Sequence, residues 1–394
     1  MVPSPAPLDR RARRTLTPFI DRAAATPGAD RYRKTFTARA HLWMLLLHVW
    51  WGSDSLRQSY GRLSGCSAWL ALWGMETIVS FSQFARSSTS RPVRCAETLF
   101  AEALTAARDQ HPTDRQWRLL TRVQAIDSTF LRLSATLSPW SQHNRATPGV
   151  RLQTSLDLVG RLPSRLRLTT SEVNDHTALW QWDLTGLAGW TLLFDRGYYG
   201  HRQFARLIDA GVHFVACCSE QAHFQQQRAL QPPAGLTPDG DQIDADAIVV
   251  LGSANNRRGA VIPNLRLIGV TTRSGKRMKL VTDRHDLSAT EVVRLYRKRW
   301  QIELFFRWLK RHLGVIRPLG RSQAALELTL ILAVAFMLLL LMLDGQRSAT
   351  MSRIAYAGAL ATTLLLTVVI DWAIDYYRTH GCSPLDDVPH AASG

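Results

Sequence analysis

Three acidic residues stand in sequence contexts that ordinarily exclude charge. Asp127 lies inside the apolar stretch "VQAIDSTFLRLS", Asp195 ends the run "WTLLFD", and Glu303 is the one acid in the basic segment "YRKRWQIELFFRWLKRHL". A carboxylate in apolar surroundings is costly unless a partner compensates it. Carboxylate oxygens are also the hard ligands that Mg²⁺ prefers. Together, the three acids predict a two-metal site that acts on phosphate groups.

The basic segment predicts a helix with a narrow polar stripe. At ~100° per residue, Arg299, Glu303 and Lys310 fall within an arc of roughly 60° on the side that also carries Tyr296. Most of the remaining surface is apolar, so we expect the helix to be buried with its stripe facing a charged object in a cleft. The stripe then offers one acid for the metals and several groups for phosphate.

Each acid also has a simpler interpretation. Asp127 is compatible with a turn or a helix cap, and Asp195 with ordinary turn chemistry before Gly197. Glu303 has the helical spacing to pair with Arg299 or Arg307. The combination favours catalysis because the order of the elements places the two aspartates on strands that could be neighbours.

The elements around the first two acids predict an α/β domain with a mixed sheet. Three strand-like stretches between residues 122 and 174 precede a helix at 175–184, the strand ending at Asp195, a helix at 201–210 and a strand at 212–218. Strands alternating with helices in this way are typical of the α/β class.

The stretch from residue 219 to about 282 predicts a β-rich insertion, with the strands "AIVVLG", "NLRLIGVTT" and "RMKLVTD". One long helix follows. It begins with a capping box at Ser288 and Glu291 and ends at Gly314.

The resulting domain prediction has six parts. They are a disordered basic tail, an N-terminal all-helical DNA-binding domain, the first part of a catalytic domain, the β-rich insertion, the second part of the catalytic domain with the Glu303 helix, and a C-terminal helical tail of unknown role. In that order they span residues 1–30, 31–118, 119–216, 217–285, 286–345 and 346–394.

The composition indicates a polyanionic partner. The 394 residues carry a formal net charge of +17 and a pI near 10.5. Such a balance is typical of proteins that bind nucleic acid or an anionic membrane surface, although an arginine-rich genome produces it too. The five cysteines form no cluster with ligand spacing, so we expect neither a zinc site nor disulfides.

Two features of the sequence bear on location. The N-terminus has no apolar core of signal-peptide length, which predicts a cytoplasmic protein. The uncharged run from Thr329 to Leu343 is shorter than the ~20 residues that span a bilayer, so we expect a buried core helix. A second apolar run ends at Ile370.

Tyr296, Arg299, Glu303 and Lys310 match the signature Y-(2)-R-(3)-E-(6)-K, by which the chain resembles the IS4 family of bacterial insertion-sequence transposases. The resemblance extends to "AIDSTFLRLS" around the first aspartate and "FDRGYYG" around the second. It also includes "KTFTARAHLWMLL" and "SLRQ" in the N-terminal helices, and it covers residues 34 to 343.

This resemblance implies a DDE transposase with an RNase H-like catalytic domain. Asp127, Asp195 and Glu303 would be the catalytic acids and would hold two Mg²⁺ or Mn²⁺ ions. The implied partners are double-stranded DNA, as transposon ends and target, and a second subunit of a homodimer in the synaptic complex. The implied location is the bacterial cytoplasm at the nucleoid, with no membrane. The implied DNA-binding residues are Tyr296, Arg299, Lys310, Arg307 and Arg151.

The sequence departs from the family pattern in two places that matter for mechanism. Where members commonly carry a Lys and a His, "GVRLQTSLD" has Arg151 and Gln153. No tryptophan lies between Trp190 and Trp300, so a hairpin route of excision is not predicted. Two alternatives stay open, namely an RNase H-like nuclease without transposition and a catalytically inert DNA-binding remnant.

Overall fold

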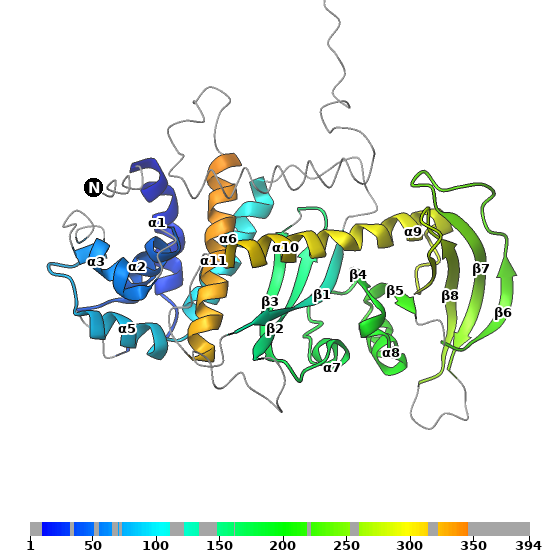
Figure 1. Cartoon of the computed structure of the whole chain (residues 1–394), viewed down its shortest axis with the longest axis horizontal. Helices are drawn as coiled ribbons and strands as arrows, with labels where there is room; N and C mark the ends of the chain where they lie inside the picture. Colours follow the sequence, from blue (N-terminus) through cyan, green and yellow to red (C-terminus); the bar gives the residue numbers. More distant parts are fainter. Residues whose placement is uncertain are drawn as a thin grey trace, which may run out of the picture. The chain divides into compact units, whose positions relative to one another are not determined.

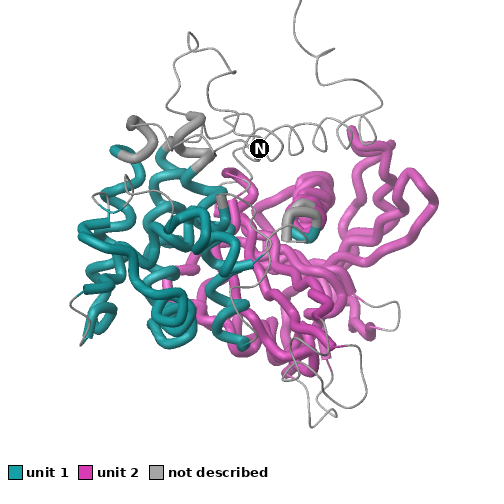
Figure 2. Tube along the Cα trace, turned by 60° about the vertical axis from the view of Figure 1, so that its left-hand side comes forward, with its two compact units in different colours: residues 1–110, 308–394 teal, residues 111–307 magenta. Residues whose placement is uncertain are grey.

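The computed structural model describes residues 10–31, 35–50, 55–64, 70, 73–110, 122–133, 148–160, 162–218, 222–252, 260–313 and 322–345. The chain forms two compact units. One comprises residues 1–110 and 308–394, and the other comprises residues 111–307 (Figure 2). The three predicted acids all belong to the second unit.

A nine-stranded mixed sheet organises the second unit. Its order is β3-β2-β1-β4-β5-β9-β8-β7-β6 (Figure 1). Strands β1, β4 and β5 are mutually parallel, and every other neighbouring pair is antiparallel. The strands are β1 Val123–Arg132, β2 Gly149–Asp157, β3 Leu162–Thr170, β4 Thr191–Phe194, β5 His213–Cys218, β6 Phe224–Leu230, β7 Gln242–Leu251, β8 Ile262–Thr271 and β9 Arg277–Thr282.

The predicted order of elements in the first half of this sheet is confirmed. Strands β1, β2 and β3 precede α7 (Asp175–Trp180), β4, α8 (His201–Asp209) and β5. The four residues of β4 are all buried, as expected for a parallel strand covered on both faces. The mixed α/β class is therefore confirmed.

The second half of the sheet contains one strand more than the sequence predicted. The three expected strands correspond to β7, β8 and β9, and β9 joins the sheet by pairing with β5. The additional strand, β6, is the edge strand with the sequence FQQQRAL. Its residues are largely exposed, so it lacks the apolar alternation on which strand prediction depends.

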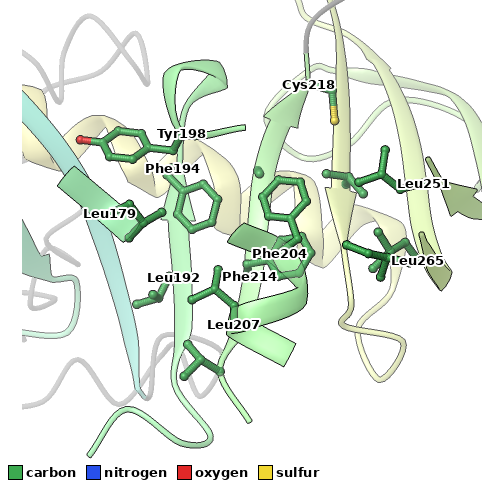
Figure 3. Packing of buried hydrophobic residues seen from close by; sticks show 14 of the residues in the cluster. Leu179, Leu192, Phe194, Tyr198, Phe204, Leu207, Phe214, Cys218, Leu251 and Leu265 are labelled. Carbon is green, nitrogen blue, oxygen red and sulfur yellow. The ribbon is translucent and has the colours of Figure 1, made fainter. Parts of the chain in front are cut away.

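Alternate residues of the central strands pack into two separate cores, because successive side chains point to opposite faces of a sheet. On one face, the rings of Phe194, Phe204 and Phe214 stack between the sheet and α8 (Figure 3). The centroids of Phe204 and Phe214 are 4.4 Å apart. On the other face, Leu193 and Val215 pack with residues of α9 (Ala289–Arg297) and α10 (Gln301–Leu313).

The predicted long helix is not uniform. The capping box at Ser288 and Glu291 is confirmed, and α9 begins directly after it. A 3₁₀ turn over Lys298–Trp300 then separates α9 from α10. The backbone stays in the right-handed helical region there, but i→i−3 hydrogen bonds replace part of the i→i−4 ladder. The prediction of one continuous α-helix was wrong at this turn, and the predicted end at Gly314 lies outside the described residues.

The described elements of the first unit are helices, and α11 fits the predicted core helix. Leu330, Val334 and Leu338 of α11 are all buried. Among the helices that the structure describes, none combines the length and apolar character needed to cross a membrane. The helices are α1 Arg10–Ala24, α2 Ala38–Trp50, α3 Leu56–Ser64, α5 Phe81–Ser90, α6 Arg94–Gln110 and α11 Gln323–Gly345.

The prediction of a disordered tail over residues 1–30 was wrong for α1. Leu16, Ile20 and Ala23 lie on one side of this helix and are buried. An apolar stripe at helical spacing can be buried even when the surrounding composition is rich in Arg and Pro. The predicted tail 346–394, including the apolar run ending at Ile370, lies outside the described residues.

Candidate active site

Asp127 and Asp195 stand at the same level of two adjacent parallel strands. In the pairing of β1 with β4, Ala125 lies opposite Leu193, so the same register places Asp127 level with Asp195. Ala125 and Leu193 both face the core beneath α9 and α10. Residues two positions further along point to the same face, so we infer that both aspartates face these helices. This is the carboxyl end of the parallel strands, where open α/β sheets usually carry functional groups.

Arg299 connects the first acid to the third. Its Nη1 donates to Asp127 Oδ2 at 2.9 Å, and its Nη2 donates to Glu303 Oε1 at 2.7 Å. The side chains of Arg299 and Asp127 are each 14% exposed. A planar guanidinium suits such a bridge because its donors have a fixed fork geometry. The bridge brings together residues 172 positions apart in the sequence.

The surroundings of Asp127 oppose its ionisation. The pKa of Asp127 is raised from 3.8 to about 7. Burial is the main cause and the charges of Asp195 and Glu303 add to it, while Arg299 and the backbone N–H of Ser128 act in the opposite direction. Two neighbouring carboxylates thus influence the same group. The structure therefore gathers all three predicted acids.

A tight turn orients Asp195. Asp195 caps the 3₁₀ turn Arg196–Tyr198, and its Oδ1 accepts a hydrogen bond from the backbone N–H of Gly197 at 2.8 Å. A Cβ atom at Gly197 would lie 3.1 Å from Asp195 Oδ1 and 3.2 Å from Asp175 Oδ2. Glycine therefore allows two carboxylates to approach the same point of the backbone.

The predicted DNA-binding residues occupy three kinds of position. Arg307 and Lys310 are exposed on α10, about one and two turns beyond Glu303. Tyr296 is partly buried and shares a hydrogen bond with the thiol of Cys217, and burial raises its pKa. Arg151 lies on β2, where its Nη1 donates to Ser128 Oγ at 3.3 Å. Its side chain is 33% exposed.

Asp175 is a fourth acid of this region, and the sequence analysis did not identify it. Its Oδ1 accepts a hydrogen bond from Ser128 Oγ at 2.5 Å and lies 3.7 Å from Arg151 Nη1. Asp175 is the first residue of α7, after the helix cap Asn174. In the sequence, Asp175 has the position of an ordinary acid in the first turn of a helix, and no pattern connects it to Ser128.

The chemistry of the acids fits a divalent cation, but their present contacts do not form a ready-made metal centre. Within the described residues, no three His, Cys, Asp or Glu side chains are gathered closely enough to hold a metal ion. Asp127, inside β1, and Asp195, directly after β4, offer carboxylate oxygens at the same level of the sheet. Arg299, however, is paired with Asp127 and Glu303, so a metal that binds both acids competes with its guanidinium for their oxygens.

Comparison with known proteins identifies the family. Residues 118–341, more than half of the chain, match the family described as "Transposase DDE domain". The chain belongs to the DDE transposases. The matched range includes Asp127, Asp195 and Glu303. This membership makes the chain an enzyme of DNA cleavage and strand transfer, and proteins with this domain generally depend on divalent cations.

Two curated relatives and one solved structure are similar to this DDE transposase. The "Putative transposase y4zB" of Sinorhizobium fredii is 31% identical over 260 residues, which is 65% of this chain and 69% of the relative. The "Probable transposase for insertion sequence element IS5377" of Geobacillus stearothermophilus is 23% identical over 342 residues, which is 86% of this chain and 85% of the relative. The structure of the piggyBac transposase synaptic complex with hairpin DNA matches with a TM-score of 0.42 and 9% identity, over 95% of this chain and 82% of that one.

Proposed function

We propose that this chain is the transposase of an insertion sequence of the IS4 type. It binds the terminal inverted repeats of its element, cuts the DNA at the ends of the element and joins the 3′-hydroxyls to target DNA. The observation that carries this proposal is the convergence of three acids, two at the same level of the adjacent strands β1 and β4 and one held to Asp127 through Arg299.

The proposed fold of the catalytic domain is RNase H-like. The support is the order β3-β2-β1-β4-β5, in which β1, β4 and β5 are parallel and β2 and β3 are antiparallel to their neighbours. Strands β6 to β9 then form the insertion between the second and third acids. Residues before β1 form the N-terminal helical domain that binds DNA.

The proposed ligands of two Mg²⁺ or Mn²⁺ ions are Asp127, Asp195 and Glu303. When bound, such ions activate the attacking oxygen and stabilise the leaving oxygen of phosphoryl transfer. The protein's own contribution begins with Asp127, which must give up its proton, since its pKa is about 7. Cationic charge near a carboxylate favours its ionised form, so metal binding and loss of this proton are coupled.

The proposed DNA contacts use the basic residues around the acids. Arg299 is charged and partly buried, so a phosphate that reaches it competes with Asp127 and Glu303 for the same donors. Arg307 and Lys310 are exposed and free to follow the backbone of a bound duplex. Tyr296 and Arg151 complete the set, and the net charge of +17 favours the approach of DNA. A homodimer would hold the two ends together in the cytoplasm, at the nucleoid.

Strand transfer by the purified chain tests this proposal. The substrate is a duplex oligonucleotide that ends in the inverted repeat found beside the gene, incubated with Mn²⁺ and a target plasmid. Asp127→Ala, Asp195→Ala and Glu303→Ala should each abolish strand transfer while DNA binding is retained. Asp209→Asn removes an exposed acid at the end of α8 and serves as the control with unchanged activity.

The same assay separates the alternatives. Cleavage without joining indicates an RNase H-like nuclease, and binding without cleavage in Mg²⁺ or Mn²⁺ indicates an inert remnant. Full strand transfer by the Glu303→Ala variant would contradict the assignment of the third acid.

A further inference from the structure

A second polar cluster adjoins the three acids on the other side of β1. It consists of Ser128, Arg151 and Asp175, which come from β1, β2 and the start of α7. Ser128 follows Asp127 directly, so its side chain points to the face opposite that of Asp127, toward α7. Asp175 also approaches Gly197, two residues after Asp195. The cluster is thus attached to the chain next to both strand aspartates.

Within this cluster, Asp175 has the contacts of a residue that orients Arg151. Its Oδ1 accepts the hydroxyl of Ser128 at 2.5 Å and lies 3.7 Å from Arg151 Nη1, and the same Nη1 donates to Ser128 Oγ at 3.3 Å. These three atoms form a closed triangle of one acid, one hydroxyl and one cation. These contacts restrict the Arg151 side chain, which otherwise has many accessible rotamers.

Arg151 keeps donors that the cluster does not use. Both of its described contacts involve Nη1, and its buried Nε has no hydrogen-bond partner. A guanidinium has five N–H donors and binds a phosphate through two of them in a fork. The Arg151 side chain is held at one nitrogen, is one-third exposed and has unused donors. It is therefore prepared to bind an oxyanion.

The buried surroundings of the cluster are polar. The hydroxyl of the fully buried Tyr198 donates to Gln153 Oε1 at 3.4 Å, while Gln153 Nε2 has no partner. Burial raises the pKa of Tyr198, and the charges of Asp175, Asp127 and Asp195 raise it further. The Tyr198 hydroxyl therefore stays neutral and lies among three carboxylates, which connects Asp175 to the region of the two catalytic aspartates.

We propose that Asp175 is a positioning residue of the transposase, which holds Arg151 against Ser128, the residue after Asp127, to receive a phosphate of the bound DNA end. The proposal rests on the proposed function in one respect, namely that Arg151 contacts DNA. Asp175 itself touches neither the DNA nor the metals. Its effect on DNA binding passes through Arg151 and Ser128.

The proposal predicts that removal of Asp175 weakens DNA binding, whereas simple electrostatics predicts that it strengthens binding. Removing an acid near a polyanion normally strengthens binding, because repulsion is lost. If Asp175 orients Arg151, however, Asp175→Ala weakens binding of the DNA end, because the phosphate contact is no longer prearranged. Asp175→Asn keeps an oxygen that can accept from Ser128 but loses the ionic attraction for Arg151. We therefore expect an intermediate effect from Asp175→Asn.

The test measures binding of the full chain to a fluorescent duplex carrying the terminal repeat, in EDTA, at several salt concentrations. Loss of one phosphate contact lowers the slope of log K against log salt by about 0.9. Arg151→Gln should show this change, and Asp175→Ala should show most of it. Adding Asp175→Ala to Arg151→Gln should weaken binding no further and should not lower the slope again. Asp209→Asn is the charge-matched control, and thermal unfolding of each variant verifies that it is folded.

The remaining outcomes separate the possible failures. Tighter or unchanged binding by folded Asp175→Ala overturns the positioning role, and so does an equal loss in the wild-type and Arg151→Gln backgrounds. If Arg151→Gln itself leaves the slope unchanged, Arg151 is not a DNA contact. That result refutes the DNA-binding assignment of Arg151 and the positioning role with it, while the three catalytic acids are unaffected.

Discussion

Replacing Asp127 by Asn should stabilise the folded chain while it abolishes activity. The environment of Asp127 raises its pKa from 3.8 to about 7. At about 1.4 kcal/mol per pH unit, the folded chain is destabilised by up to roughly 4 kcal/mol when this carboxyl is ionised. Asn has nearly the same shape and no charge, so it removes this cost.

The sign of the effect follows from proton binding. A group whose pKa is raised by folding stabilises the folded state at low pH, and this stability is lost as the pH rises from about 4 through about 7. The advantage of Asp127→Asn should therefore be greatest at pH 8 and fall to roughly a third at pH 5. For a unit of this size, a gain of 2–4 kcal/mol corresponds to an increase of roughly 5–10 °C in Tm.

The assay is thermal unfolding in EDTA at pH 5 and pH 8, so that metal ions do not bind the acids. Asp209→Asn again provides the control, because its carboxylate is exposed. A lower Tm for Asp127→Asn at pH 8, or a gain of the same size at both pH values, would refute the reasoning. Either result would mean that the charge of Asp127 is compensated in the fold.

Three further predictions concern the neighbouring groups. The affinity for Mn²⁺, measured from the electron paramagnetic resonance signal of the free ion, should increase as the pH rises through about 7, since Asp127 must lose its proton; a flat profile would exclude Asp127 as a ligand. Gly197→Ala should reduce strand transfer by up to roughly 10-fold, because its Cβ requires the carboxylates of Asp195 and Asp175 to shift by a few tenths of an ångström, while the Tm changes little. Wild-type activity would contradict the close approach. Arg266→Met should cost about 3–5 kcal/mol, because the carboxylate of Asp246 is 3% exposed and would lose its partner. Adding Asp246→Leu should restore most of that stability in chemical denaturation, and no recovery would mean that the loss has another cause.

Local pattern was sufficient to predict the sheet around the two proposed catalytic aspartates. The run TLLF is apolar throughout because β4 is covered on both faces, and Asp195 marks its end. The position of Asp127 within an otherwise buried strand was visible in the same way. Both signals depend on neighbours along the chain, so they can be detected without knowledge of the tertiary structure.

Contacts between distant segments could not be predicted in the same way. The bridge from Arg299 to Asp127 spans 172 residues, whereas the sequence indicated only phosphate or the nearby Glu303 as partners of Arg299. Asp175 and Ser128 are 47 residues apart, and neither has an unusual sequence context. Strand β6 was missed because an edge strand need not be apolar, and α1 was missed because composition obscured three buried residues.

The distance along the chain between the first acid and its partner has a consequence during synthesis. Arg299 and Glu303 leave the ribosome long after Asp127 and Asp195. At ~5–20 residues per second, roughly 10–35 s pass before Arg299 can reach Asp127. In the later part of this interval, after Asp195 is made, the nascent chain has both strand aspartates but no third acid. A prematurely terminated product that ends in β6, β7, β8 or β9 would lack the proposed third acid, so we expect that only translation through α10 yields an enzyme capable of breaking a chromosome.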